Sequence, residues 1–280
     1  DITDDKLKDL LEQRSGYGPF TSRLASRAID LVVDQAGPEG LALHYDFPRE
    51  DVPEFVQTFA TWLQYEHGIT PTDEMRVAMY AHAANGGIKI DKTAATGVAG
   101  LYACGEATGG MHGADRIGGL SSANGIVFGR IAGASAAQAA QKEPAAALKA
   151  NIPLPQYGIA KTDAERLTHS LKHTMSSYCM INRTEMGLSE ALHELEGLKT
   201  EATTLSAQKA QDSEVAALAR LQSQIQLAQE MVKAMRNRTE CLGSHSRADY
   251  IESHFEFDHN SSTSIEPRKQ DSLRENTLTE

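Results

Sequence analysis

The sequence predicts an α/β segment followed by an all-α helical C-terminal domain. Glycine is dense between residues 86 and 141, where short β-like runs precede one long apolar run. From Asp163 to Asn237, in contrast, apolar residues recur almost without interruption at helical spacing. Strand, loop and helix in that order are typical of α/β proteins, whereas the long periodic stretch is typical of a helical bundle.

The first part of the chain, residues 1–80, combines short helical patterns with proline and aromatic residues. The spacing of apolar residues predicts one helix from Ser22 to Asp34. A second helix is predicted around Phe55 to Leu63, ending before Gly68. Prolines separate the two, because proline has no amide hydrogen for a helix interior.

Residues 81–141 carry the α/β pattern. Two runs, residues 87–91 and 100–104, have a β-like composition. The apolar run from Ile126 to Ala140 then predicts a buried helix, since it has no polar face of its own.

Residues 142–162 contain three prolines and are predicted to be a linker. The helical domain follows over residues 163–255. Its longest apolar seam runs from Leu218 to Met235 in steps of three and four residues. This pattern favours the inside of a small antiparallel bundle over a coiled-coil dimer contact. Residues 256–280 are polar and are predicted to form a tail.

Composition excludes several classes of function. The 280 residues carry 27 Lys and Arg against 38 Asp and Glu, a net charge of −11, which argues against nucleic acid as a partner. Three scattered cysteines without a CxxC pair predict neither a disulfide framework nor a metal site. The sequence shows no signal peptide and no run of about 20 apolar residues for a membrane span. We therefore expect a cytoplasmic protein.

One glycine-rich stretch holds the strongest chemical signal. Seven glycines from Gly100 to Gly119 let the backbone approach a ligand closely. Glu106 follows a predicted strand, where a carboxylate suits ligand hydroxyl groups. Ser121 and Ser122 open the next predicted helix, whose free amide groups favour an electron-rich atom. From these residues alone, the alternative is equally supported: Ser121 only caps the helix and Glu106 is solvated.

Short motifs recur in a fixed order between residues 80 and 250. They are His82 with Gly86-Gly87, Gly100-Leu-Tyr-Ala-Cys-Gly-Glu106, His112-Gly-Ala-Asp-Arg-Ile-Gly-Gly-Leu-Ser121, Arg183-Thr-Glu-Met-Gly-Leu188 and Glu240-Cys-Leu-Gly-Ser-His-Ser-Arg-Ala-Asp-Tyr250. These stretches resemble motifs of the flavoprotein subunits of succinate dehydrogenase and fumarate reductase, and of L-aspartate oxidase. Their number and order make the resemblance specific.

The resemblance implies that residues 1–80 are a capping-domain segment and residues 81–141 the C-terminal part of an FAD-binding domain. Such proteins open with a dinucleotide-binding βαβ unit that carries GxGxxG, a pattern that this sequence lacks. We therefore expect the missing N-terminal FAD-binding half to be supplied in cis or in trans. The chain alone is expected to retain no FAD and to be inactive.

FAD is thus the cofactor that the resemblance implies. Glu106, with Gly105 before it, corresponds to the residues that hold the ribitol hydroxyls of FAD. The turn formed by Ser121 and Ser122 corresponds to the one that meets the flavin ring.

The resemblance also assigns the substrate site. His82 and Arg116 would bind the carboxylates of a C4 dicarboxylate, and the fork of an arginine pairs well with a carboxylate. Without the resemblance, His82 is better interpreted as a core histidine, and Arg116 as an exposed partner of Asp115.

In this family an arginine of the capping domain exchanges the proton that accompanies hydride transfer. The stretch Gly18–Ile29 resembles the family pattern P-R-D-V-V-x-R-A-I. With a gap of one residue, Arg23 takes the place of that arginine, and Arg27 is the second candidate. Without the resemblance, both arginines are interpreted as solvated residues near or on the predicted helix.

Three positions depart from the family pattern: Asp115 and Leu120 replace asparagines, and Leu242 replaces an arginine. Asp115 would partly neutralise the neighbouring Arg116, so that the substrate could differ from an ordinary dicarboxylate.

The resulting prediction is part of an FAD-dependent oxidoreductase that transfers hydride between flavin and succinate or fumarate. Two enzyme alternatives are L-aspartate oxidase and a reductase of another 2-enoate, which Asp115 and Leu120 would suit. The non-enzyme alternative is a helical interaction module, with a partner on the Leu218–Met235 seam and a vestigial flavin loop. The resemblance also implies a partner that carries iron–sulfur clusters (an iron–sulfur subunit) and peripheral membrane attachment through partner subunits.

Overall fold

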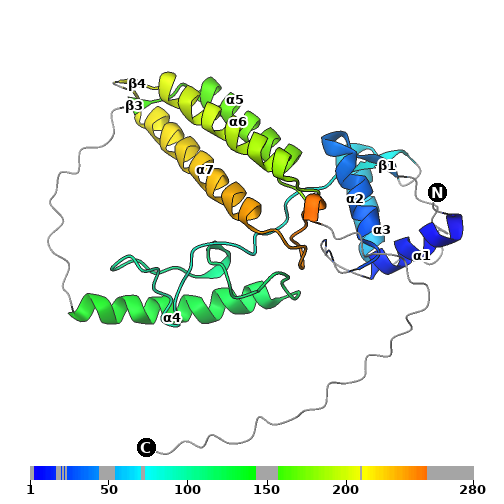
Figure 1. Cartoon of the computed structure of the whole chain (residues 1–280), viewed down its shortest axis with the longest axis horizontal. Coiled ribbons are helices and arrows are strands. Elements are labelled where there is room, and N and C mark those ends of the chain that lie inside the picture. The colour runs from blue at the N-terminus through cyan, green and yellow to red at the C-terminus, as the bar shows by residue number, and fades with distance from the viewer. Residues whose placement is uncertain are drawn as a thin grey trace, which may run out of the picture. The chain divides into compact units, whose positions relative to one another are not determined.

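Three long helices hold most of the hydrophobic core (Figure 1). The computed structural model describes residues 3–16, 20, 22, 24–43, 54–70, 73–142, 157–208 and 210–250. The three helices are α5 (Lys161–Tyr178), α6 (Glu185–Thr204) and α7 (Asp212–Asn237). Short connections join them into an antiparallel bundle, and β3 (Tyr157–Gly158) pairs with β4 (Ala207–Gln208) at one end of it.

The bundle core confirms the predicted apolar faces. Its buried side chains include Leu167 and Leu171 of α5, Leu188 and Leu195 of α6, and Leu218, Leu221, Ile225 and Val232 of α7. Burial of each such side chain contributes about 1.5–3 kcal/mol relative to an exposed one. The seam of α7 therefore faces the inside of the bundle, as predicted.

Polar residues fix where these helices begin. The side chain of Thr184 accepts a hydrogen bond from the Gly187 amide at 3.0 Å and caps α6. Gln211 and Glu214 form a reciprocal capping box at the start of α7.

The N-terminal part contains three helices and one pair of short strands. The elements are α1 (Asp4–Ser15), α2 (Arg27–Gln35), the 3-10 turn η1 (Gly37–Glu39), β1 (Leu41–Leu43), α3 (Glu54–His67) and β2 (Met75–Val77), with β1 and β2 antiparallel. The second predicted helix is thus confirmed as α3. The first begins later than predicted, at Arg27, and the residues just before it form turns, with hydrogen bonds from the Arg27 amide to Leu24 and from the Ala28 amide to Ala25.

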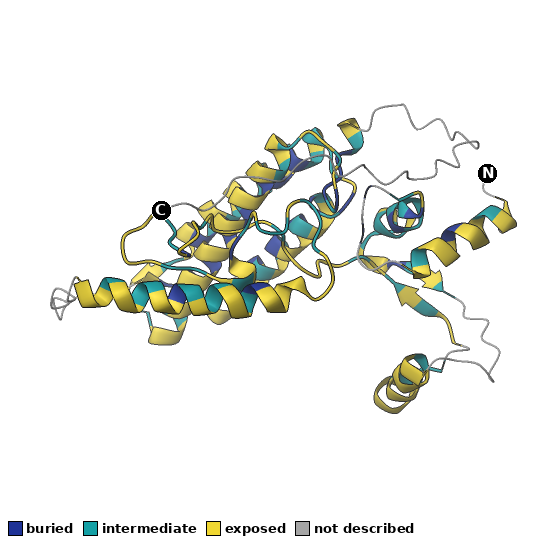
Figure 2. Ribbon diagram, turned by 90° about the horizontal axis from the view of Figure 1, so that it is seen from below, coloured by how far each residue is buried: buried dark blue, intermediate teal, exposed yellow. Residues whose placement is uncertain are grey.

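The predicted helix from Ile126 to Ala140 is present as α4 (Leu120–Lys142), but its predicted burial is wrong (Figure 2). Ile126 is 74% exposed and Val127 is 52% exposed. Of its residues, Asn124 and Ala132 alone are buried. The apolar run satisfies helix periodicity, but the described elements cover one side of it only, where the 3-10 turn η2 (Gly105–Ala107) contacts α4, and they leave Ile126 and Val127 exposed.

The β-like runs make single bridges rather than continuous strands. Ile88 forms a parallel bridge with Thr108, and Ala95 forms an antiparallel bridge with Tyr102. A regular strand needs a neighbour along its whole length, and within the described residues each run finds one at a single position. Most of the predicted linker, residues 143–156, and the predicted tail, residues 256–280, lie outside the described residues.

Candidate functional site

Two backbone segments of the glycine-rich region pass very close to each other. Ile88 donates its amide to the Ala107 carbonyl at 2.8 Å, and Gly109 donates to the Ile88 carbonyl at 3.1 Å. A Cβ atom at Gly87 would lie 2.5 Å from the Ala107 oxygen, and one at Gly109 would lie 2.5 Å from the Gly87 nitrogen. Both positions therefore require glycine.

This close approach brings Glu106 to the segment of His82. Glu106 Oε1 accepts a hydrogen bond from the Ala84 amide at 3.0 Å. His82, two residues earlier, is exposed. The predicted cofactor carboxylate and the predicted substrate histidine thus belong to one local structure.

Gly105 is the first residue of the 3-10 turn η2 (Gly105–Ala107), and its carbonyl contacts α4. Its carbonyl accepts a hydrogen bond from Thr108 Oγ1 at 2.6 Å and from Asn124 Nδ2 at 3.5 Å. Asn124 Nδ2 also lies 3.3 Å from His112 Nε2, so His112 shapes this turn. Asn124 is buried, and its Oδ1 has no hydrogen-bond partner in the described part of the chain. Asn124 Oδ1 is therefore a buried acceptor, close to Gly105, that could accept a hydrogen bond from a ligand.

The start of α4 brings Arg116 and Ser121 together. Arg116 Nη1 donates to Ser121 Oγ at 3.4 Å, and among the described residues Arg116 forms no ion pair with Asp115. The Ser122 amide donates to the Gly119 carbonyl at 3.2 Å. The amides of Ser121 and Ser122 were both predicted to be free. The Ser122 amide is hydrogen-bonded within the chain, so this prediction is wrong for Ser122.

A turn of the helical domain, residues 242–245, contacts both the segment that follows His82 and the segment that precedes Arg116. We call it the junction turn. Ser244 donates to the Ala114 carbonyl twice, from its amide at 3.0 Å and from its hydroxyl at 3.2 Å. The same hydroxyl accepts a hydrogen bond from Asn85 Nδ2 at 3.2 Å. Gly243 has φ +60°, and a Cβ atom there would lie 2.3 Å from the Ala114 oxygen. The turn thus packs directly onto the backbone that leads to Arg116.

The junction turn also contacts the segment of the predicted proton-transferring arginine. The Ser22 amide donates to the Gly243 carbonyl at 2.7 Å. Arg23 itself lies outside the described residues. Arg27, the second candidate, donates from Nη1 to the Ser22 carbonyl at 3.0 Å, across the turn that precedes α2.

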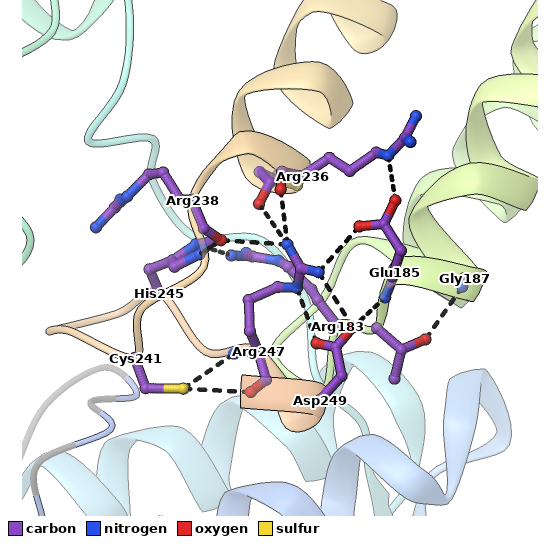
Figure 3. A network of polar contacts seen from close by, with 11 residues as sticks. Arg183, Glu185, Gly187, Arg236, Arg238, Cys241, His245, Arg247 and Asp249 are labelled. Carbon is purple, nitrogen blue, oxygen red and sulfur yellow. Dashed lines mark hydrogen bonds and ion pairs between the residues drawn. The ribbon is translucent and has the colours of Figure 1, made fainter. Parts of the chain in front are cut away.

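A fully buried arginine anchors the junction turn to the end of α7 (Figure 3). Arg247 Nη1 donates to the carbonyls of Arg236 at 2.9 Å and of Arg238 at 3.2 Å. Its other nitrogens contact the carboxylates of Glu185 at 3.1 Å and of Asp249 at 3.0 Å. The hydrogen bond from Arg247 lowers the pKa of Asp249. The buried charge is thus fully paired, and its role is structural.

His245 is a second structural residue of this network. Its Nδ1 lies 2.8 Å from Arg183 Nη1, and its Nε2 lies 3.1 Å from the Arg238 carbonyl. A guanidinium only donates and a carbonyl only accepts, so the ring is neutral and carries its proton on Nε2. Burial, followed by the charge of Arg183, lowers the pKa of His245 below its usual value.

Sequence reasoning did not find four residues that connect these segments: Ser22, Asn85, Asn124 and Ser244. All four are ordinary polar residues, and three of them make contacts with residues far away in the chain. The available signal was that Asn85 and Ser244 stand inside the recognised motifs, and that Ser22 stands inside the stretch Gly18–Ile29, which resembles the family pattern.

Known proteins of similar sequence span most of this chain. One chain of the fumarate reductase (CoM/CoB) of Methanothermobacter marburgensis is 28% identical over 251 residues, which are 85% of this chain and 46% of that protein. The L-aspartate oxidase of Streptomyces coelicolor is 32% identical over 200 residues, 66% of this chain and 33% of that protein. Residues 22–122 match the family described as FAD binding domain, and residues 168–279 match the family described as fumarate reductase flavoprotein C-term. The chain belongs to the succinate dehydrogenase and fumarate reductase flavoprotein family.

Solved structures of similar fold agree with membership of this flavoprotein family. Mycobacterium smegmatis Sdh1 in complex with UQ1 has a TM-score of 0.68 at 26% identity, over 83% of this chain and 42% of that chain. These neighbours confirm the predicted fold class, a partial FAD-binding domain with a capping segment followed by a helical C-terminal domain. The chain spans between a third and a half of the length of the relatives named above.

FAD is the cofactor of this flavoprotein family, and the residues beside Gly105 fit it. Gly105 and Gly119 have φ of +72° and +83°, and nothing lies within 4 Å of a Cβ atom built at either. This leaves open space next to the backbone. The buried Oδ1 of Asn124 and the exposed carboxylate of Glu106 supply acceptors, which suit the hydroxyl groups of a ribitol chain.

Two further features concern metal ions and membranes. In the ranges that the structure describes, no three His, Cys, Asp or Glu side chains gather to hold a metal ion. Among the helices in those ranges, none is long and apolar enough to cross a membrane.

Proposed function

We propose that this chain is part of an FAD-dependent oxidoreductase that acts on a C4 dicarboxylate, with succinate and fumarate as the substrate pair. The observation that carries the proposal is the hydrogen bond from the Ala84 amide to Glu106. It joins the residue expected to hold FAD to the segment expected to bind substrate. A site for hydride transfer needs such proximity between cofactor and substrate.

The predicted residues around the substrate each have a role in the proposal. Arg116 and His82 bind the substrate carboxylates, while Ser121 receives the hydrogen bond of Arg116 and presents its amide at the start of α4. Arg23 exchanges the proton that accompanies the hydride. FAD, when bound, accepts or donates that hydride.

The apolar surface of α4 supports a further part of the proposal, namely that a dinucleotide-binding unit completes the FAD site. Ile126 and Val127 are exposed here, and contiguous exposed apolar surface is typical of a contact with another protein element. We propose that a unit with the GxGxxG pattern covers this face, in cis or in trans. This chain alone would then bind no FAD and would be inactive.

L-aspartate oxidation is the second candidate, because relatives with that activity are as similar to this chain as the fumarate reductases. The non-enzyme alternative finds less support. The seam from Leu218 to Val232 is buried in the bundle core and is therefore covered by α5 and α6.

Two further features complete the proposal. An iron–sulfur subunit would exchange electrons with the flavin. The proposal also includes a cytoplasmic location, with attachment to a membrane only through partner subunits.

The first test is the visible absorption spectrum of this chain alone, before and after addition of FAD. We expect no protein-bound flavin band. A shifted band with fine structure would contradict the need for a separate dinucleotide-binding unit.

The second test uses the complete FAD-loaded flavoprotein that contains this chain. After anaerobic reduction with dithionite, fumarate is expected to reoxidise the flavin, and a His82→Ala variant is expected to lose this response. In the oxidised protein, reduction of the flavin by succinate but not by L-aspartate supports the proposal. Reduction by L-aspartate alone would assign L-aspartate oxidation instead.

A further inference from the structure

We propose that Ser244, in the junction turn of the helical domain, is a positioning residue that sets the relative placement of the two carboxylate-binding segments. The proposal rests on the proposed function, since it assigns carboxylate binding to His82 and Arg116. It adds that a residue outside the FAD-binding domain determines the affinity for the dicarboxylate.

The hydroxyl of Ser244 both accepts and donates a hydrogen bond. It accepts the hydrogen bond from Asn85 Nδ2 at 3.2 Å and donates its own hydrogen to the Ala114 carbonyl at 3.2 Å. Asn85 lies three residues after His82, and Ala114 lies two residues before Arg116. One hydroxyl group therefore joins the two segments.

The turn that carries Ser244 is itself held firmly. Its amide donates to Ala114 at 3.0 Å, and Gly243 lies too close to the Ala114 carbonyl for any side chain. Arg247, fully buried, fastens the following residues to the end of α7. Because the junction turn is held by these contacts, it can hold the two loops that Ser244 joins at a fixed distance from each other.

The same turn extends the connection to the capping segment. The Gly243 carbonyl accepts the Ser22 amide at 2.7 Å, and Ser22 directly precedes Arg23 in the chain. Three segments that hold the predicted substrate and proton-transfer residues thus meet at two consecutive residues of the helical domain. Of these two residues, Gly243 takes part through its backbone, whereas Ser244 also contributes a side chain.

A loss of the hydroxyl link would change substrate binding more than the chemical step. The bonds that His82 and Arg116 make to the carboxylates exist before and during hydride transfer, so their misplacement raises KM more than it lowers kcat. For the loss of one hydrogen bond we expect KM to rise roughly three- to tenfold.

The experiment compares variants of the complete FAD-loaded flavoprotein. KM and kcat for fumarate are measured in Ser244→Ala, Asn85→Ala and the double variant. Ser244→Thr keeps a hydroxyl group and tests rescue. Ser246→Ala is the matched control, because Ser246 is buried in the same loop and its hydroxyl makes no hydrogen bond with the described residues. Hydrogen exchange of the peptides over residues 82–87 and 112–116 is measured in parallel.

The proposal predicts a raised KM and a kcat within about twofold of wild type for both single variants, because one shared link is lost in each. The double variant should be no worse than either single one, Ser244→Thr should restore KM, and exchange should be faster in both peptides. An unchanged KM in Ser244→Ala, or an equal rise in Ser246→Ala, would overturn the proposal. A wild-type protein that binds no dicarboxylate would instead overturn the proposed function, and the exchange rates alone would then show whether Ser244 joins the two segments.

Discussion

The backbone amide of Ser22 donates a hydrogen bond of 2.7 Å to the carbonyl of Gly243. This contact joins the segment before α2 to the junction turn after α7, two parts of the chain that are far apart in sequence. The contact therefore holds Ser22 against the helical domain. α2 itself begins only at Arg27, after turn hydrogen bonds from the Arg27 amide to Leu24 and from the Ala28 amide to Ala25.

Gly243 is expected to tolerate no side chain. Its φ is +60°, and a Cβ atom would lie 2.3 Å from the Ala114 carbonyl oxygen. We expect Gly243→Ala to lower the free energy of unfolding by at least about 2 kcal/mol, through backbone strain and the displaced carbonyl. Urea denaturation measures this. In the control Gly197→Ala, on α6 with open space at the Cβ position, stability should change little or increase by up to about 1 kcal/mol.

Arg247 and Arg236 both contact Glu185, but they differ in burial. The side chain of Arg247 is fully buried, whereas that of Arg236 is 44% exposed. We expect Arg247→Met to cost about 3–5 kcal/mol of stability, because the carbonyls of Arg236 and Arg238 and two carboxylates all lose their donor at once. Arg236→Met should cost less than about 1 kcal/mol. Equal losses in the two variants, measured by denaturation, would contradict the structural role of Arg247.

Helix positions could be predicted from the sequence because helical periodicity is local. The seam from Leu218 to Val232 is buried as predicted, and α3 and α4 form where the apolar spacing places helices. Burial of α4 could not be predicted in the same way. The composition of Ile126–Ala140 reports that the residues are apolar, whereas burial depends on which other element covers them.

Cys179 should be unreactive in the folded protein. It is buried, and burial raises the pKa of its thiol to about 11. At pH 8 roughly one such thiol in a thousand is ionised, and the thiolate is the reactive form. Iodoacetamide labelling followed by mass spectrometry should therefore modify exposed Cys104 and leave Cys179 unmodified until denaturant is added. Rapid labelling of Cys179 under native conditions would contradict the packing of α5 against α6 and α7.

Stability should fall as the pH drops below about 6.5, and His245 is the cause. Its pKa is lowered in the folded state, so the unfolded chain takes up a proton first as the pH falls from 6.5 toward the folded pKa. The pKa of Glu185 is lowered by its hydrogen bond from Arg236, and that of Asp249 by its bond from Arg247. These two carboxylates therefore lose their stabilising effect only at lower pH.

Unfolding free energies at pH 7.5 and at pH 5.5 separate these effects. The wild-type protein should lose stability between the two values. A His245→Gln variant should be less stable at pH 7.5 but should show a smaller loss on acidification. The same pH dependence in both proteins would show that other groups are responsible.

The candidate site could be predicted only in part, for a physical reason. The motifs identify Glu106, His82 and Arg116 because each lies in a recognisable run of residues. The links between the runs, such as Asn85 to Ser244, depend on tertiary packing of distant segments. A sequence alone gives no spacing from which such a contact follows.

The most direct test of the account is the affinity of the FAD-loaded flavoprotein for malonate, a dicarboxylate that undergoes no hydride transfer. The Kd is obtained from the change in flavin absorbance, in wild type, His82→Ala, Arg116→Gln and the control Arg220→Gln, an exposed arginine on α7. The account predicts a Kd raised about 10- to 100-fold in the first two variants, the loss expected for a charge-assisted hydrogen bond, and a wild-type Kd in the control. Wild-type affinity in either His82→Ala or Arg116→Gln would contradict the claim that these two segments form one dicarboxylate site.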